Sequence, residues 1–138
     1  RAWRMTWSAN WFHNDIDPLE TILFFPTRRP FSLPGSTDNT WDLTLNNRFL
    51  LPGSVELQAN YIRYASRNVP QGRERARSSV DFSAKKALMN ERADLVFTFT
   101  DIFNDFALQH EIQGRGFTAL YQNFLETQVA TVGIRYRF

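Results

Sequence analysis

Apolar and polar residues alternate with a period of two along six segments of the chain, 3–13, 41–51, 55–63, 79–88, 94–104 and 126–138. In the first segment, one face carries Trp3, Met5, Trp7, Ala9 and Trp11, and the other carries Arg4, Thr6, Ser8 and Asn10. This period is that of a strand with one apolar and one polar face, and helical spacing explains none of the segments better. The pattern predicts an all-β fold of six long strands, over about 2–14, 40–51, 54–66, 77–88, 92–104 and 124–138.

The connections between these segments alternate strictly between short and long. Residues 51–54 and 89–92 are tight turns, whereas about 15–39, 67–76 and 105–123 are long links. An antiparallel up-and-down meander with short turns at one rim and long loops at the other is typical of transmembrane barrels, in which the short turns are periplasmic and the long loops extracellular. The first long link contains Pro18, Pro26, Pro30 and Pro34, so we expect it to be irregular and exposed.

The predicted strands are long for a globular protein. They run to about ten residues or more, whereas globular strands average about 5–6. Ten residues at ~3.3 Å each, tilted by about 40–45°, rise roughly 24 Å, which is close to the ~25 Å apolar band of an outer-membrane barrel. Strand length therefore favours a strand that crosses a membrane.

Three features favour lipid over a second protein layer as the environment of the apolar face. Aromatic residues gather near segment ends, as the interfacial girdles of barrels require; they are Trp3, Trp11, Trp41, Phe49, Tyr61, Phe103 and Tyr136. The opposite face is rich in Ser, Thr, Asn and Gln, as in a wet or plugged lumen, and the chain stops at an aromatic residue of the apolar face. Asn47, Lys86 and Asp101 break the pattern. We expect Lys86 and Asp101 to lie near strand ends, where a charge costs only ~0–1 kcal/mol, whereas the pattern offers no account of Asn47.

Six strands leave two open edges, which a bilayer does not tolerate because unpaired backbone groups have no water to bind. Single-chain membrane barrels begin at eight strands. The even strand number also puts both chain ends on the short-turn side. We therefore expect residues 1–138 to be a single segment, the C-terminal part of a larger transmembrane barrel in the outer membrane of a Gram-negative bacterium, with the remainder of the barrel as its partner.

Composition narrows the functional classes. There is no cysteine, and no apolar run approaches the ~18–20 residues of a membrane helix. Fourteen of the 16 basic residues are arginine, many of them in predicted loops, and the chain has no recognition helix or single basic face for nucleic acid. His13 and His110 have no further ligands at metal spacing, and no catalytic constellation stands out. We expect no metal, no cofactor and no enzymatic activity.

Three stretches resemble the end of TonB-dependent outer-membrane receptors, especially the Bacteroidetes-type outer-membrane barrel family. They are Arg77 to Lys86, Val96 to Asn104, and the terminal Val132 to Phe138. The Asp-Ile-Phe-Asn tetrapeptide 101–104, placed on the penultimate strand, and the closing Tyr-Arg-Phe are the most specific pieces. The resemblance implies a barrel of about 22 strands with a plug domain, on which TonB pulls. It also implies that Tyr136 and Phe138 match the assembly signal read by the barrel assembly machinery.

Substrates of that family are typically ferric siderophores, cobalamin, metal complexes or oligosaccharides. Loop residues that could contact substrate at the outer mouth are Phe24, Phe25, Arg28, Arg29, Tyr121 and Phe124. Arginine suits anionic groups, although loop packing and contact with anionic lipopolysaccharide are the simpler roles for these side chains. Charged residues of the polar face could pair with the plug; these are Arg4, Arg48, Glu56, Lys85, Asp94 and Arg135.

Four functions follow from this sequence. The leading one is a structural segment of a TonB-dependent transporter. The second is a passive porin-like or adhesion barrel, which would have no plug domain. The third is a soluble β-barrel carrier that hides its apolar face around a ligand, and a membrane-embedded enzyme is the most remote.

Overall fold

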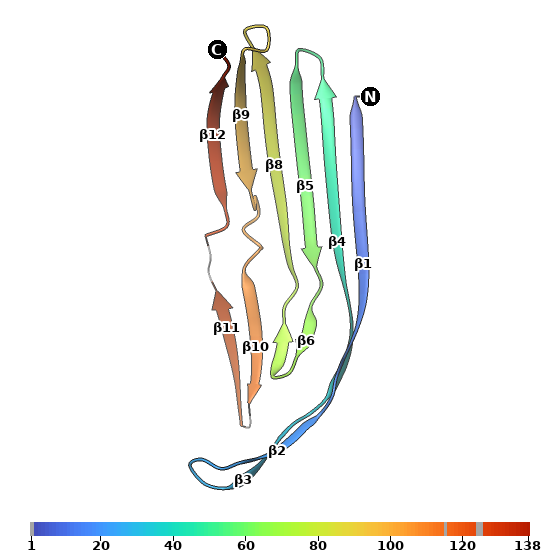
Figure 1. Cartoon of the computed structure of the whole chain (residues 1–138), viewed down its shortest axis with the longest axis vertical. Helices are drawn as coiled ribbons and strands as arrows, with labels where there is room; N and C mark the ends of the chain where they lie inside the picture. The colour runs from blue at the N-terminus through green and yellow to red at the C-terminus, as the bar shows by residue number, and fades with distance from the viewer. Residues whose placement is uncertain (1, 115, 124–125) are drawn as a thin grey trace.

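Six long strands form one antiparallel sheet in the computed structural model, which describes residues 2–114, 116–123 and 126–138. Their order across the sheet is their order along the chain, with each strand paired to the next (Figure 1). They are β1 (Trp3–Ile16), β4 (Ser36–Leu51), β5 (Val55–Tyr64), β8 (Arg77–Leu88), β9 (Ala93–Thr100) and β12 (Val129–Tyr136). The predicted meander is thus confirmed. Within the described residues, no helix is long and apolar enough to cross a membrane.

The short turns lie at one end of the sheet, together with both chain termini (Figure 1). The β4–β5 turn places Gly53 and Ser54 at φ values of 79° and 56°, in the region that glycine tolerates best. In the β8–β9 turn, Met89, Asn90 and Glu91 all have positive φ. We call this end of the sheet the turn end and the opposite end the loop end.

The first long connection is ordered, and our expectation of an irregular loop over 15–39 was wrong. The strands β1 and β4 remain paired as far as Ile16 and Ser36, and beyond them β2 (Leu19–Leu23) and β3 (Arg29–Leu33) form a hairpin. Pro30 stands inside β3 opposite Ile22. This is possible because the hairpin has only two strands, so each of them has a free edge where proline's missing N–H breaks no ladder bond.

The other two long connections join each other in a second sheet. It has four strands in the order β11 (Phe117–Asn123), β10 (Leu108–Gly114), β7 (Gly72–Glu74) and β6 (Arg67–Val69). A Cβ atom on Gly72 would lie 1.8 Å from the carbonyl oxygen of Glu111, so only glycine lets β7 approach β10 this closely. Loops that we had described only by their length therefore extend the wall of the long sheet.

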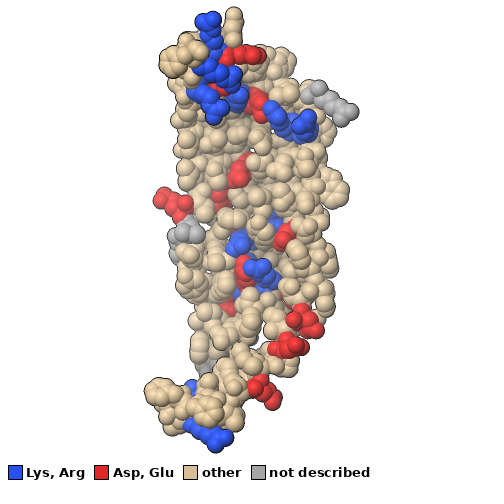
Figure 2. Space-filling model, in the orientation of Figure 1, with Lys and Arg blue, Asp and Glu red and all other residues tan. Residues whose placement is uncertain are grey.

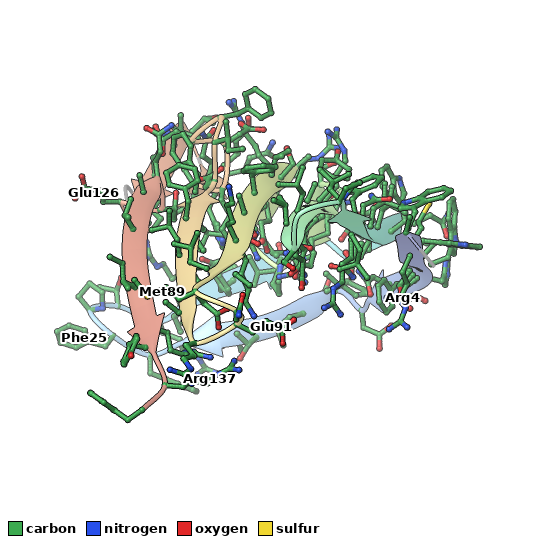
Figure 3. The ribbon with its side chains drawn as sticks, turned by 90° about the horizontal axis from the view of Figure 1, so that it is seen from above. Arg4, Phe25, Met89, Glu91, Glu126 and Arg137 are labelled. Atoms are coloured by element: carbon green, nitrogen blue, oxygen red, sulfur yellow. The ribbon has the colours of Figure 1, made fainter. Side chains whose placement is uncertain are left out.

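Strand register keeps the two faces of the long sheet separate. One row across all six strands contains Trp3, Phe49, Leu57, Ala84, Phe97 and Val132. The next row, on the opposite face, contains Arg4, Arg48, Gln58, Ser83, Thr98 and Thr131. Seen from the turn end, the sheet is an arc, with Arg4 and the β2–β3 hairpin on its concave side (Figure 3). The polar face is therefore the concave one.

Among the described residues, no second layer covers the apolar, convex face. Trp7, Trp11 and Ile134 are 66%, 71% and 78% exposed, and Ala93 is the one apolar residue that is buried in the described part of the chain. A soluble carrier would sequester these side chains against other parts of the protein. The structure has the single-layer form of a barrel wall instead.

Strand β9 ends at Thr100, four residues earlier than predicted. Asp101 and Asn104 have φ values of 47° and 54°, so the tetrapeptide 101–104 forms a turn after the strand rather than part of it. The side chain of Asp101 is 1% exposed and accepts hydrogen bonds from the amides of Asp105 and Phe106 and from the hydroxyl of Thr127. Our assignment of Asp101 to the lipid interface was therefore wrong, because the carboxylate holds a turn together.

The two other exceptions to the apolar face remain on it. Lys86 lies in a row with Val55, Leu95 and Ile134 near the turn end, which agrees with a lysine that reaches the headgroups. Asn47 lies beside Trp3, whose indole Nε1–H donates to Asn47 Oδ1 at 3.4 Å. Asn47 thus gives the Trp3 indole N–H an acceptor on an apolar surface.

Candidate functional site

Two aromatic pairs, which we call belts, lie on the convex face of β1 and β4. Trp3 stacks on Phe49 near the turn end, with centroids 6.1 Å apart and planes 7° apart. Trp11 and Trp41 lie opposite each other nearer the loop end. Trp3 and Trp11 are eight residues apart on β1, so the belts are separated by about 27 Å along the strand, or about 20 Å across a membrane at the usual tilt of barrel strands. This is the girdle arrangement that flanks an apolar band.

Ion pairs line the concave face at the turn end. Arg48 Nε lies 2.7 Å from Glu56 Oε1, and the almost buried carboxylate of Asp94 is 3.5 Å from Lys85 Nζ and 3.2 Å from Arg137 Nη2. Figure 2 shows acidic and basic side chains gathered at this end and a second group nearer the loops. The wall thus pairs many of its own charges.

Six residues of this face were predicted to reach a plug. Four of them pair within the wall, as Arg48 with Glu56 and Lys85 with Asp94. Arg4 lies opposite Arg48 and Arg135 opposite Asp94 in the strand register. Neither Arg4 nor Arg135 has an ion-pair partner among the described residues, so these two are the charges of the set that the wall leaves available to another part of the protein.

The structure does not bring together the five predicted loop contacts that it describes. Phe24 and Phe25 lie in the β2–β3 connection, 76% and 87% exposed, and Arg28 Cζ is 5.8 Å from the centroid of the Phe24 ring. Tyr121 lies on β11, where its ring packs edge-on against His110 at 6.5 Å. Arg29 begins β3. The sixth candidate, Phe124, lies outside the described residues.

A cavity of about 540 Å³ lies where the three long connections meet. It is lined by β3 and Pro34, by Gln71 of the β6–β7 turn, and by the tip of the β10–β11 hairpin. We call it the mouth cavity; its residues are Arg29, Pro30, Phe31, Ser32, Leu33, Pro34, Gln71, Ile112, Gln113, Gly114 and Phe117. Of the five predicted contacts that the structure describes, Arg29 alone lines it.

The other lining residues were missed because sequence reasoning treated their segments as loops. Ile112 and Phe117 come from β10 and β11, and Phe31 and Leu33 from β3. A Cβ atom on Gly114 would lie 2.1 Å from the Phe117 ring, so this ring lies directly over Gly114 and is held at the cavity. An aromatic ring that covers a glycine across a hairpin is a known pattern, so Gly114 and Phe117 could have indicated this hairpin from the sequence.

The mouth cavity is mainly apolar, with one guanidinium and two amide side chains at its wall. Such a lining suits a ligand with an apolar body and an anionic group, since Arg29 offers a planar fork to a carboxylate or phosphate. Its volume falls within the usual range of small-molecule pockets.

The two histidines lie in separate settings. His13 Nδ1 is 3.0 Å from Asn39 Oδ1 near the loop end of β1, and His110 packs against Tyr121. In the described part of the chain, no group of three or more His, Asp or Glu side chains is placed to hold a metal ion.

The C-terminal aromatic residues form a pair. Tyr136 ends β12, and its ring meets that of Phe138 edge-on, with centroids 5.1 Å apart. Both side chains are exposed, and Tyr136 lies on the convex face opposite Ala93. The pair therefore stands at the turn end of a strand edge that is open in this structure.

Comparison with known proteins agrees with this architecture. A family model described as "Outer membrane protein beta-barrel family" matches residues 1–136. Neither the curated proteins nor the solved structures with which the chain was compared include a match.

Proposed function

Because the chain belongs to the outer membrane protein beta-barrel family, we propose that it is a wall segment of a TonB-dependent transporter. Membership of the family, together with the six-stranded meander, makes it part of a β-barrel in the cell outer membrane. The apolar convex face meets lipid and the polar concave face lines the lumen. The transport activity is the part that we propose.

The observation that carries the proposal is the charged, concave wall at the turn end. Arg4 and Arg135 are left without ion-pair partners there among the described residues, while neighbouring charges pair with one another. A plug domain with acidic groups would complete this wall, as opposed charges across a contact give specificity and register. The stretches 96–104 and 132–138 add the resemblance to TonB-dependent receptors.

The open edges support a large barrel. In the described residues β1 pairs with β4 alone and β12 with β9 alone, so six strands do not close on themselves. Lipid does not tolerate such edges, and further strands, up to the about 22 that the resemblance to TonB-dependent receptors implies, would cover them. Substrate would enter at the mouth cavity, and TonB would act through the plug rather than on this segment.

Conductance separates this proposal from a passive barrel. The full-length protein in a planar bilayer should stay closed, because a plug fills the lumen, and should conduct once urea at a concentration that spares the barrel unfolds the plug. Replacing Arg4 and Arg135 together with glutamate should weaken the plug contact and raise the basal conductance, whereas the same change at Thr131, also on the concave face, should not. A large, steady conductance in the unmodified protein without urea would overturn the proposal.

A passive porin-like barrel remains the second candidate because of one observation. The β2–β3 hairpin lies on the concave side and extends across the loop end of the sheet (Figure 3), where it could narrow an open pore. In that case, deletion of residues 19–33 would raise the conductance of the unmodified barrel.

The position of this segment in the barrel wall also predicts which lipids and proteins it contacts. We propose lipid and lipopolysaccharide as the surroundings of the convex face and the loops. We also propose the barrel assembly machinery as the reader of the terminal pair Tyr136 and Phe138.

A further inference from the structure

An arginine lies on the apolar, convex face close to the belt of Trp11 and Trp41. Arg63 of β5 shares a row of this face with Leu43. Its guanidinium carbon lies 5.9 Å from the centroid of the Trp41 ring, which is one row nearer the loop end. The side chain thus leaves the apolar surface and turns outward to the belt, as long basic side chains do at a membrane interface.

A second arginine faces outward from the loop sheet. Glu74 of β7 lies on the concave side, where its carboxylate binds Arg67 at 2.7 Å and Arg77 at 3.2 Å. Arg77 shares a concave row with Asp42, which fixes the side on which Glu74 lies. Successive residues of a strand point to opposite faces, so Arg73, which precedes Glu74 in β7, faces the convex side.

The two arginines reach toward the same stretch of chain. Arg73 Nη2 donates to Ser66 Oγ at 2.7 Å, so its side chain extends back toward the long sheet. Ser66 follows Ala65, whose backbone amide donates to the Trp41 carbonyl at 2.9 Å. Arg63 extends outward to the ring of the same tryptophan. Two guanidiniums therefore flank the point where the wall leaves the outer belt.

Neither guanidinium has a carboxylate partner within residues 2–114, 116–123 and 126–138. The acidic side chains near them in the strand order bind other groups. Glu111, which lies opposite Arg73 in the register, pairs with Arg75, and Asp105 accepts a serine hydroxyl of β8. An unpaired charge beside hydrocarbon is costly, and such charges in membrane proteins usually mark a contact with another charged group. Arg63 and Arg73 thus require an anion from outside the wall.

We propose that Arg63 and Arg73 bind a phosphate group of lipid A in the outer leaflet. The guanidinium fork suits phosphate because it can donate two parallel hydrogen bonds. On the membrane side of the arginines, the convex face continues with Leu43, Leu45 and Tyr61, along which acyl chains can lie. A free phosphate would leave this apolar surface uncovered, so the geometry favours a phosphate that is attached to a lipid.

This inference goes beyond transport, because the site faces lipid and requires neither a plug nor TonB. It depends only on the position of the chain in an outer-membrane barrel, which membership of the family supports. A passive barrel would carry the same site.

The test uses the full-length protein, freed of bound lipid in detergent, and native mass spectrometry with lipid A. Dephosphorylated lipid A and inorganic phosphate are the comparison probes. Lipid A should bind more tightly than either probe. Arg63→Gln and Arg73→Gln should each weaken its binding about tenfold, since each removes one charge-assisted contact. Arg92→Gln, which removes an exposed arginine at the turn end, is the matched control and should leave the binding unchanged.

Three results would overturn the inference. Equal binding of the two forms of lipid A would show that the phosphate is not recognised. Displacement of lipid A by an equal concentration of inorganic phosphate would indicate a site for a free anion. Binding that Arg63→Gln and Arg73→Gln weaken no more than Arg92→Gln does would place the contact elsewhere. Both arginines are exposed, and the heat-resistant electrophoretic mobility of a folded barrel verifies that each variant has folded.

Discussion

The backbone amide of Asp101 donates a hydrogen bond to Oδ1 of Asp81 on the neighbouring strand, at 2.9 Å. The same oxygen accepts the Ser79 hydroxyl at 2.8 Å, and the Asp101 carboxylate in turn accepts two amides and the Thr127 hydroxyl. Two aspartates in series therefore end β9 and fix the path of the chain into the loop sheet. A carboxylate is the one short side chain with enough acceptor sites for this role.

Replacing Asp101 with alanine should destabilise the protein strongly. The change leaves two partly buried amides and a hydroxyl without an acceptor, for an expected loss of about 3 kcal/mol in the free energy of unfolding. Asp101→Asn keeps one acceptor oxygen and should lose less. Urea unfolding of the full-length protein in lipid vesicles measures both. Equal stability of Asp101→Ala and the unmodified protein would contradict the turn network described above.

The two faces of the sheet predict opposite responses to a new charge. Ala59 lies on the convex face, in the row midway between Lys86 and Arg63, and Asn60 is its neighbour on the concave face. Ala59→Arg should cost about 2–4 kcal/mol because its guanidinium enters hydrocarbon. Asn60→Arg should be close to neutral, since it faces water and Asp81. The measurement is the folded fraction of each variant in lipid vesicles. A larger loss in Asn60→Arg than in Ala59→Arg would mean that we have assigned the two faces the wrong way round.

The junction of the two loops should depend on Gly72. Alanine there would place its Cβ against the Glu111 carbonyl, so we expect β7 to separate from β10 while the long sheet stays intact. The measurement is hydrogen exchange, which should become faster at residues 108–114. Gly133→Ala serves as the control, because a Cβ at Gly133 meets nothing within 4 Å. Unchanged exchange in Gly72→Ala would show that the two loops are held together by other contacts.

Trp3 and Asn47 should be coupled energetically. Their hydrogen bond lies on the convex face, where the indole N–H has little water nearby, and we expect a coupling of about 0.5–1.5 kcal/mol. A double-mutant cycle with Trp3→Phe and Asn47→Leu measures it from unfolding free energies. Additive effects of the two changes would mean that Asn47 is tolerated rather than used.

The terminal aromatic pair predicts an effect on assembly rather than on stability. Phe138 lies beyond the end of β12 and is fully exposed, so Phe138→Ala removes little buried area. We expect fewer folded barrels in the outer membrane, with an unchanged unfolding midpoint for those that form. Met89→Ala, an exposed apolar residue at the same end, is the control. A lowered midpoint without an assembly defect would make Phe138 a packing residue.

The faces and the order of the long strands were readable from the sequence. Side chains alternate strictly along a strand, so the residues that share a face are decided by their odd or even position, before any partner is known. The rows through Trp3 and Arg4 are direct consequences of that rule once neighbouring strands pair in the order of the chain. The short turns were readable for the same reason, since they are local.

The candidate sites were much harder to predict from the sequence, and among the five predicted contacts that the structure describes, Arg29 alone lines the mouth cavity. The mouth cavity depends on β3, on the β6–β7 turn and on the β10–β11 tip, which come from three different connections. Short strands such as β6 and β7 carry too few residues to show a period, and besides pairing with each other they join a sheet through the pairing of β7 with the distant β10. Their formation depends on contacts between distant segments.

The sequence by itself determined which side chains face hydrocarbon and which face the lumen, because a two-residue period is a property of the local backbone. Tertiary structure alone decided the end of β9 at Asp101, the hairpin within 15–39 and the grouping of Glu74 with Arg67 and Arg77. The end of β9 rests on contacts of Asp101 with Asp81 and Thr127, which long-range strand pairing brings together. The hairpin and the ion pairs of Glu74 join residues that are near in sequence, but their segments are too short for a two-residue period to reveal them.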